Sequence, residues 1–358
     1  PPAMARYKKR PGFDQPLPGL FDNLEGNSLF PEIEPLPIHP SISEAARREA
    51  SKALHGGTAK QRRELFANDD FTPLEVGTPQ MKLTFMSFGS GSSGNCAFVS
   101  DGETGILIDA GVDSDSVIRQ LGLYGIKMES VRGVLLTHDH SDHVRYVYKI
   151  VRKRFNTGVY CTPRTLNGLL RRHNISNRLK DYHRPIYKEH PFKIGGFTIT
   201  AFDVSHDGTD NCGFFIQRGD RNIVIATDMG MISERADFYI RQANHLMIEA
   251  DYDDAMLEAG SYPEYLKARI RGAMGHLSNT VTANYLREIY HPGLRNVFLC
   301  HLSKDNNTPR LATATVEAAL TAAGATVGDA SNTPYARMCS LQLLALPRYD
   351  ATPLIPLL

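Results

Sequence analysis

The sequence predicts an α+β protein in which β-sheets are covered by helices in layers. From Met81 onward, short apolar runs rich in β-forming residues recur, each bounded by Gly, Asp, Asn or Pro. Helical patterns separate only some of these runs, so the chain lacks the strict βαβ alternation of a doubly wound sheet. A length of 358 residues suffices for one large domain with a substantial core or for two smaller ones.

The elements follow from these patterns in chain order. Helix 308–323 has the clearest start, because Thr308 is a good N-cap and Pro309 suits the first helical position. The expected strands are Leu83–Phe88, Ala97–Ser100, Gly105–Ile108, Gly133–Thr137, Gly158–Cys161, Phe197–Phe202, Gly213–Gln217, Asn222–Thr227, His245–Glu249, Asn296–Cys300 and Ser340–Leu346. The expected helices are Ser114–Tyr124, Asp142–Arg154, Thr162–His173, Ser278–Tyr290 and Thr308–Ala323.

Composition divides the chain into three parts. Residues 1–80 open with a proline-rich segment and continue with two short helical patterns, Ser43–Leu54 and Thr58–Asn68, so we expect an N-terminal arm with short helices. Its sequence indicates no particular role. Residues 81–348 form the expected main domain, and residues 349–358 a C-terminal tail.

Bulk properties exclude some classes of protein. No apolar run approaches the roughly 20 residues that a membrane span needs, and the basic N-terminus lacks the apolar core of a secretory signal. The five cysteines are scattered and include no CxxC pair, which favours reduced, buried thiols in a cytoplasmic protein. The formal net charge is only +1, so only its distribution can indicate a polyanionic partner. The sequence does not indicate an oligomeric state.

The stretch "GVLLTHDHSDHVRY", residues 133–146, carries the strongest chemical signal. His138 and His140 lie two residues apart at the end of an expected strand, so their side chains share one side if the chain stays extended. Asp142 and His143 follow where a helix should begin. Imidazole and carboxylate groups are the usual ligands of zinc and similar divalent ions. A solvated helix start is the plain alternative.

Further ligand-type residues stand at the ends of other expected strands. Asp109, His206, Asp228 and His301 each follow a short apolar run. Taken singly, such a histidine is usually a hydrogen-bonded edge residue, and such an aspartate usually caps a turn. Their repetition beside the histidine cluster instead predicts a metal site assembled from several strand ends.

These residues resemble the metallo-β-lactamase-fold hydrolases. The motif His138-x-His140-x-Asp142-His143 is followed by His206, Asp228 and His301 at intervals of 63, 22 and 73 residues, and the resemblance covers about residues 81–346. It implies a four-layer αββα sandwich with two divalent metal ions, zinc being favoured over manganese. One ion would be held by His138, His140 and His206, and the other by Asp142, His143 and His301. Asp228 would bridge the ions, and Asp109 would orient a ligand.

The same resemblance implies a mechanism. A hydroxide bridging the two metals would act as the nucleophile, while the cations stabilise the developing charge. Asp142, Asp109 and His276 are the expected catalytic residues. His140 stands where flavodiiron proteins place a carboxylate, which argues against a redox di-iron enzyme.

Local charge and loop composition favour a phosphodiester substrate. Residues 145–193 hold thirteen Lys or Arg against two acidic residues, a local charge of +11 directly behind the histidine cluster. A solvated helix face balanced elsewhere is the alternative. The loop "SFGSGSSGN", residues 87–95, is rich in glycines and hydroxyls that suit an anion, or it is merely a flexible hairpin loop. The expected substrate-binding residues are Ser90, Ser92, Ser93, Asn95, His276, Ser278, Asn279, Ser303 and Asn306.

Together these motifs resemble the YycJ/WalJ-type bacterial exonucleases. The resemblance implies a DNA exonuclease acting 5′ to 3′, with DNA preferred over RNA as the partner and no membrane association. Only 72 residues separate Asp228 from His301, so we expect no β-CASP insertion. A small-molecule hydrolase, either a thioesterase or a cyclic phosphodiester hydrolase, and a ribonuclease remain alternatives, as does a non-catalytic nucleic-acid-binding module.

Overall fold

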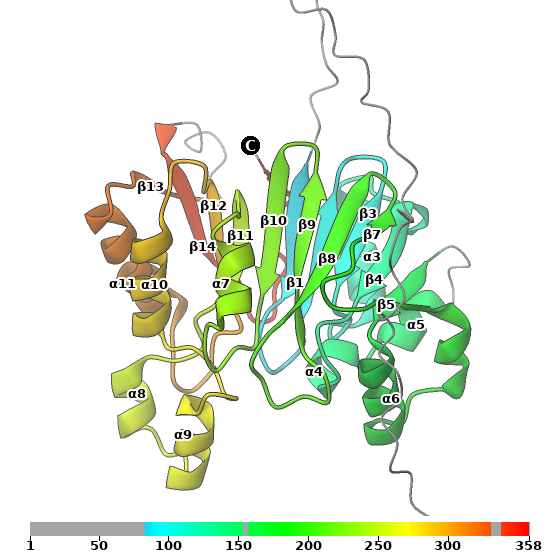
Figure 1. Ribbon diagram of the computed structural model, residues 1–358, viewed down its shortest axis with the longest axis horizontal. Coiled ribbons are helices and arrows are strands. Elements are labelled where there is room, and N and C mark those ends of the chain that lie inside the picture. Colours follow the sequence, from blue (N-terminus) through cyan, green and yellow to red (C-terminus); the bar gives the residue numbers. More distant parts are fainter. Residues whose placement is uncertain (1–82, 153–156, 331–337, 358) are drawn as a thin grey trace, which may run out of the picture. The chain divides into compact units, whose positions relative to one another are not determined.

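A computed structural model describes residues 83–152, 157–330 and 338–357. The expected arm 1–80, with its two helical patterns and the boundary at Met81, lies outside these residues. Within them the chain forms two β-sheets flanked by helices (Figure 1).

The first sheet contains both antiparallel and parallel strands, with β3, β4 and β5 parallel to one another. Across the sheet, its order is β15 (Ile355–Pro356), β1 (Thr84–Gly89), β2 (Cys96–Ser100), β3 (Gly105–Ile108), β4 (Val131–Leu135), β5 (Gly158–Cys161) and β6 (His183–Pro185).

The second sheet is mixed in the same way, with β10, β11, β12 and β14 parallel. Its order is β13 (Val327–Asp329), β14 (Leu341–Ala345), β12 (Asn296–Cys300), β11 (His245–Glu249), β10 (Arg221–Ala226), β9 (Cys212–Arg218), β8 (Phe197–Asp203) and β7 (Phe192–Ile194).

The helices lie on the outer side of each sheet, those of the first sheet on the right in Figure 1 and those of the second on the left. The first group comprises α3 (Ser114–Leu123), α4 (Ser141–Val144), α5 (Val147–Val151) and α6 (Pro163–Arg172), with the 3-10 turns η1 (Met128–Ser130) and η2 (Asn177–Tyr182). The second comprises α7 (Glu234–Ile240), α8 (Asp254–Ala259), α9 (Glu264–Arg271), α10 (Asn279–Ile289) and α11 (Pro309–Ala322).

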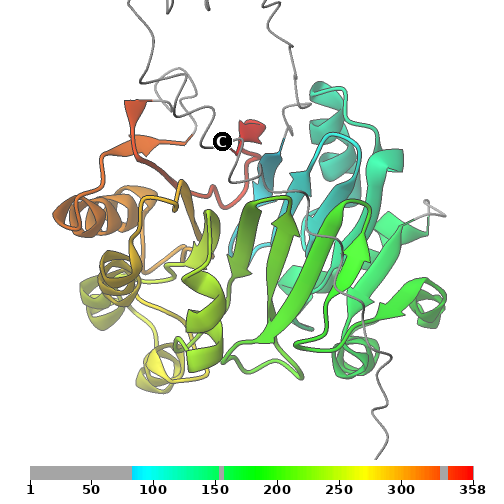
Figure 2. The ribbon, with the colours of Figure 1, turned by 45° about the horizontal axis from the view of Figure 1, so that its top comes forward.

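Alternating burial along each strand produces the layers. In β10, Ile223 and Ile225 face the other sheet, whereas Val224 and Ala226 face the helices. Strands covered on both faces need apolar residues at every position, which explains why they read as continuous apolar runs. Across the inter-sheet core, Phe85 of β1 stacks on Phe298 of β12 with ring centroids 4.2 Å apart. The predicted four-layer αββα architecture is therefore confirmed (Figure 2).

The expected helix Asp142–Arg154 is wrong as a single element. It divides into α4 and α5, and residues 153 and 154 lie outside the described part of the chain. The break has a tertiary cause. The Tyr146 amide donates to the Ala110 carbonyl, and the Asp142 carbonyl accepts from the Asn95 amide, so neither joins a continuous helical ladder.

The remaining expected helices lie within a residue or two of the observed ones, and the expected strands shift by no more than two residues at either end. Helices α7, α8 and α9 and strands β6, β7, β13 and β15 had no counterpart in the sequence-based prediction. Residues 349–358, set apart as a tail, contain β15, which pairs with β1 through Thr84–Pro356 and Phe85–Ile355.

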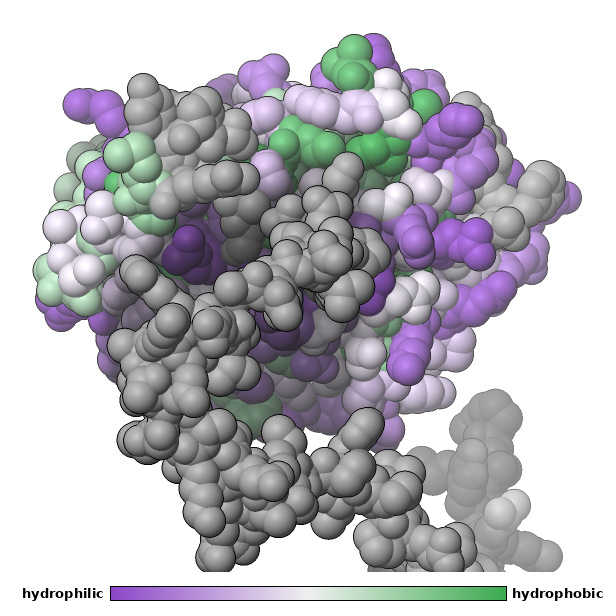
Figure 3. Space-filling view, turned by 90° about the horizontal axis from the view of Figure 1, so that it is seen from above, coloured by the Kyte–Doolittle hydropathy of each residue, from purple (hydrophilic) through white to green (hydrophobic). Residues whose placement is uncertain are grey.

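Helix length, cysteine environment and surface hydropathy are further properties of the described residues. None of the helices among them is long and apolar enough to cross a bilayer. All five cysteines are free thiols, four buried and Cys339 partly exposed. Seen from the edge opposite α4, the visible surface of these residues is mostly hydrophilic, with a smaller hydrophobic area (Figure 3).

Candidate metal centre

The candidate centre lies at the edge where parallel strands of both sheets end. Carboxyl ends of parallel strands meet at one edge of a sheet, so residues that directly follow them come together. Asp109 follows β3 and His138 follows β4 in the first sheet, whereas Asp228 follows β10 and His301 follows β12 in the second. His206 follows β8, which runs parallel to β10 because both are antiparallel to β9.

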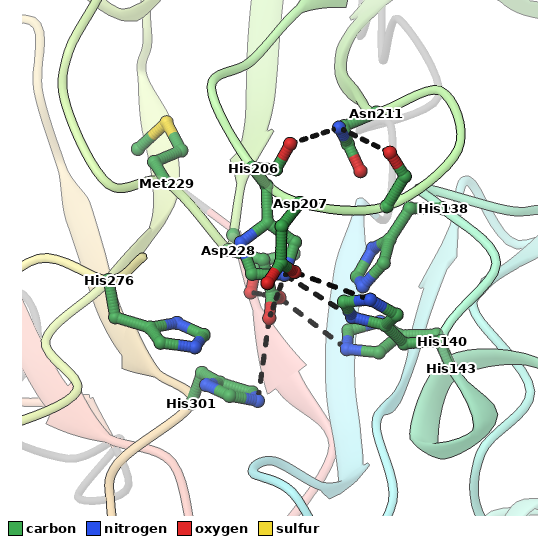
Figure 4. Close-up of polar contacts among 12 residues, drawn as sticks. His138, His140, His143, His206, Asp207, Asn211, Asp228, Met229, His276 and His301 are labelled. Carbon is green, nitrogen blue, oxygen red and sulfur yellow. Dashed lines mark hydrogen bonds and ion pairs between the residues drawn. The ribbon is translucent and has the colours of Figure 1, made fainter. Parts of the chain in front are cut away.

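His138, His140 and His206 form the first group of potential ligands (Figure 4). One ligand atom of each lies within 4.8 Å of the others. His206 Nε2 is 3.3 Å from His140 Nδ1, and the rings of His138 and His206 stand edge to face with centroids 5.0 Å apart. Because Nδ1–H of His206 donates to the Gly275 carbonyl, its Nε2 keeps a free lone pair.

The second group consists of Asp142, His143 and His301, and one ligand atom of each again lies within 4.8 Å of the others. Oδ2 of Asp142 lies 3.5 Å from His143 Nε2 and 3.6 Å from His301 Nε2. The first two residues come from α4 and the third from the end of β12, so this group spans both sheets.

Asp228 lies between the two groups (Figure 4). Its Oδ1 is 3.8 Å from His206 Nε2 and 3.5 Å from His301 Nε2, and its Oδ2 is 3.5 Å from His143 Nε2. Oδ1 thus lies near one histidine of each group, and Oδ2 near a histidine of the second group, so the carboxylate is within reach of both.

The donor set fits divalent cations. His138 Nε2 and both ring nitrogens of His301 are buried without a hydrogen-bond partner. Buried polar atoms are rarely left without a partner, and a cation would bind the unpartnered ring nitrogens. Imidazole with carboxylate suits zinc and also admits manganese.

Neighbouring groups orient the ligands from behind. Asp109 Oδ2 lies 2.8 Å from His143 Nδ1, while its Oδ1 accepts from the Thr137 amide at 2.9 Å. The Thr137 hydroxyl lies 3.0 Å from His138 Nδ1. Such partners select the ring tautomer and hold the other nitrogen outward.

The local electrostatics are those of a site built for positive charge. Burial alone would lower the pKa of His143, but Asp228, Asp109 and Asp142 together raise it to about 9. Burial alone would raise the pKa of Asp142, yet His143 and His301 lower it to about 2. The Asp142 carboxylate thus stays ionised and attracts cations at neutral pH.

Glu249 is a buried site residue that the sequence reasoning missed. Its Oε2 accepts from the Met229 and Leu277 amides, and its Oε1 lies 2.6 Å from His276 Nδ1 and 3.4 Å from His301 Nδ1. It ends β11, so the strand-end rule that singled out Asp228 and His301 would also have found it. Asp228, Glu249, His276 and His301 form another potential ligand cluster.

His276 lies beside the second group. Its ring stacks on that of His301 with centroids 5.1 Å apart, and 18% of its side chain is exposed. Burial alone would lower the pKa of His276, but Glu249 raises it to about 9. Asp139, by contrast, turns away from the centre: both its oxygens accept from Thr209.

Five of the expected substrate-binding residues are buried and bonded within the protein. Asn95 bonds the Gly91 backbone and donates to Asp142 Oδ2 at 3.2 Å, and Ser90 Oγ accepts from the His301 amide. Ser278 caps α10, Asn279 pairs with Asn307, and the Asn306 backbone bonds Asp253 and Ser303. These contacts favour positioning roles over contact with substrate.

Ser92, Ser93 and Ser303 keep some exposure. Arg348, which the sequence reasoning did not single out, donates from Nη1 to both Ser92 Oγ and Ser93 Oγ at 3.2 Å and from Nη2 to the Leu302 carbonyl. It thereby ties the serine loop to the segment after His301.

Several known proteins are similar to this chain in sequence or in fold. The β-lactamase superfamily domain matches residues 104–301. Exodeoxyribonuclease YycJ of Bacillus anthracis is 32% identical over 251 residues, which cover 70% of this chain and 94% of that protein. Exodeoxyribonuclease WalJ of Streptococcus pneumoniae is 31% identical over 240 residues, covering 67% and 88%.

Among solved structures, Zn²⁺-bound PqqB from Methylobacterium extorquens superposes with a TM-score of 0.53 at 18% identity, covering 75% of this chain and 99% of that one. The likeness to PqqB concerns the fold alone. The sequence matches show the family, and the ligand clusters agree with it. The chain therefore belongs to the β-lactamase superfamily and is a metal-dependent hydrolase of the YycJ/WalJ type, with the metallo-β-lactamase fold.

Proposed function

We propose that this hydrolase is a dinuclear phosphodiesterase that degrades DNA from the 5′ end. The observation that carries the dinuclear part is Asp228, whose carboxylate lies within 4 Å of histidines from both groups of potential ligands. The DNA substrate and the exonucleolytic mode rest on the similarity to proteins named exodeoxyribonucleases. The strand polarity rests on family resemblance, and the proposed absence of a β-CASP insertion rests on the 72 residues between Asp228 and His301.

His138, His140 and His206 would hold one ion, Asp142, His143 and His301 the other, and Asp228 both, with zinc favoured over manganese. Two such cations supply Lewis acidity, which lowers the pKa of water and offsets negative charge on a phosphodiester. The chain's own residues fix the donors: Asp109 orients His143, and the Gly275 carbonyl orients His206.

His276 is the proposed proton donor to the leaving oxygen. Glu249 holds its Nδ1, and the partial exposure of the side chain leaves the ring accessible to a substrate at the metal edge. Geometry of this kind, a positioned imidazole backed by a carboxylate, is typical of general acids.

A labelled-oligonucleotide assay tests the proposal. The Zn²⁺- or Mn²⁺-loaded protein is incubated with single- and double-stranded DNA carrying the label at either end, with RNA, and with bis(p-nitrophenyl) phosphate. We expect DNA to be shortened stepwise from the 5′ end. Intact DNA with hydrolysed small phosphodiester would instead support a small-molecule hydrolase, and preferential loss of RNA a ribonuclease.

Asp228→Asn is the diagnostic variant, since it removes the shared charge while conserving shape. We expect kcat to fall by at least a hundredfold and bound metal, measured by mass spectrometry, to drop below two ions per chain. Asp210→Asn, in the same loop region as His206 but bonded to Lys188 and Thr162, is a matched control expected to keep two ions. Full metal content in Asp228→Asn would contradict the bridging role.

A further inference from the structure

A basic pocket lies between α6 and η2, outside the metal centre. It has a volume of about 450 Å³, and its polar lining consists of Arg164, Asn167, Arg171, Asn177, Lys180 and Thr209. We propose that this pocket binds a phosphodiester group of the polynucleotide away from the one being cleaved. The proposal rests on the nuclease function and adds a substrate-binding subsite to it.

The helical register gathers the α6 contribution on one face. Arg164, Asn167 and Arg171 are spaced by three and four residues, so their side chains lie in one row. Lys180 of η2 supplies a third cation from the opposite wall. Three cations and two amides around one hollow match the needs of a phosphate, which accepts hydrogen bonds and carries a negative charge.

Ion pairing separates these cations from Lys149 and Lys188, two other members of the basic run 145–193. Lys149 is bonded to Asp113 and Asp115, and Lys188 to Asp203 and Asp210, so their charges are already balanced.

Arg164, Arg171 and Lys180 form no ion pair with a carboxylate in the described part of the chain, and all three are exposed. Three like charges that converge without an internal counter-charge create a local positive potential suited to an external anion.

One wall of the pocket is bonded to the segment that carries His138 and His140. Thr209 lies three residues after the ligand His206, and its amide and hydroxyl bond Asp139, which stands between His138 and His140. Arg164 Nη2 donates to the Thr209 carbonyl. At the other end of α6, His173 Nε2 donates to the Asp139 carbonyl at 2.6 Å. We therefore expect a DNA strand with its scissile phosphate at the metal centre to place neighbouring phosphates beside α6.

The test compares two triple variants of the metal-loaded protein. Arg164→Ala/Arg171→Ala/Lys180→Ala empties the pocket of charge. Arg119→Ala/Lys127→Ala/Arg132→Ala removes the same number and kind of charges elsewhere. Arg119 lies on α3, Lys127 precedes η1, and Arg132 lies at the start of β4, whose other end leads to His138. Binding of a fluorescent DNA oligonucleotide is measured by anisotropy at several salt concentrations, and hydrolysis of DNA and of bis(p-nitrophenyl) phosphate is measured in parallel.

We expect the pocket variant to raise the Kd and KM for DNA at least tenfold. The slope of log Kd against log salt concentration should fall by an amount that corresponds to up to about three phosphate contacts. Hydrolysis of bis(p-nitrophenyl) phosphate should stay within twofold of wild type, because that substrate is too short to reach the pocket. The control variant should bind DNA as wild type does.

The charge-conserving variant Arg164→Lys/Arg171→Lys should keep most of the affinity, which also guards against a folding defect in the alanine variant. Three results would overturn the proposed phosphate site. They are equal DNA affinity in wild type and pocket variant, equal losses of affinity in both triple variants, and no DNA binding by wild type. DNA binding that depends on the pocket without any DNA cleavage would leave the subsite standing and refute the nuclease function.

Discussion

Three residues of the candidate centre share an uncommon backbone conformation. Asp109, Asp228 and His301 have φ values of 62°, 54° and 56°. A non-glycine residue in this left-handed region costs of order 1–3 kcal/mol and persists only where its surroundings demand it, and Asp and His tolerate it better than most. Each stands at the exit of a strand, where the chain must turn sharply. Backbone strain is thus concentrated in the residues that define the site.

A substitution at Asp109 tests how strongly metal binding by His143 depends on the carboxylate that holds its Nδ1. Asp109→Asn replaces the charged acceptor of His143 Nδ1–H with a neutral amide. We expect metal affinity to fall by about 10–100-fold, the usual effect of losing such a partner. Competition with a chelator of known affinity measures it. The kcat at saturating metal should change less than the affinity, and a large kcat loss at full occupancy would argue for a direct catalytic role.

His245 gives a pH-dependent prediction away from the centre. It is buried at the start of β11, 2.8 Å from Asn296 Oδ1, and burial lowers its pKa to about 4 despite that bond. Between pH 6.5 and 4 the unfolded chain therefore binds a proton that the folded chain refuses, so stability falls as pH drops through this window.

The loss attributable to His245 should reach about 3 kcal/mol at pH 4. Urea unfolding of wild type and His245→Gln at pH 7 and pH 4 measures it, because the other titrating groups cancel between the two proteins. Parallel loss of stability in both proteins would show that His245 is not the cause.

At the scale of elements, the start of α4 is held by backbone bonds to distant loops. The Asp142 carbonyl accepts from the Asn95 amide at 2.8 Å, and the His143 carbonyl accepts from the Ala110 amide at 2.6 Å. Gly111 permits this approach, since a Cβ there would lie 1.5 Å from the Asp142 carbonyl oxygen. A four-residue helix has little stability of its own, so these contacts are what position Asp142 and His143.

Gly111→Ala should therefore displace α4. We expect the free energy of unfolding to fall by about 2–4 kcal/mol, through overpacking and a lost hydrogen bond. We also expect metal to bind more weakly at Asp142 and His143. Gly122→Ala is the matched control, because a Cβ at that position in α3 meets nothing within 4 Å. Similar stability of the two variants would contradict this view of α4.

At the scale of the whole molecule, the centre joins the two sheets. His138, Asp142 and His143 belong to the half built on the first sheet, and His206, Asp228 and His301 to the half built on the second. An ion held from both halves binds only when the sandwich is assembled. Metal binding is therefore linked to folding of the described domain.

Metal removal should lower the Tm of the protein. A ligand at a hundred times its Kd stabilises the folded state by about 2.7 kcal/mol, so the Tm should rise with added Zn²⁺ or Mn²⁺ and fall with a chelator. Differential scanning calorimetry of wild type and of the metal-depleted protein measures this shift. A Tm independent of metal would mean that the two halves do not share an ion.

The sequence by itself determined the layered α+β class, every described strand of four or more residues, and the motif around His138–His143. Apolar runs and strand-end residues are local patterns, and local patterns suffice to predict which elements form. The same patterns indicated Asp109, His206, Asp228 and His301 as candidates.

Only the tertiary structure decided which of these residues meet and what each one faces. Asp139 and Asp142 stand in one motif, yet the first bonds Thr209 and the second faces His143 and His301. Glu249 enters the site because β11 lies between β10 and β12, and the expected helix 142–154 breaks because its backbone bonds residues 95 and 110. The physical reason is the same in each case: strand order and long-range hydrogen bonds join segments far apart in the chain, and no local periodicity encodes them.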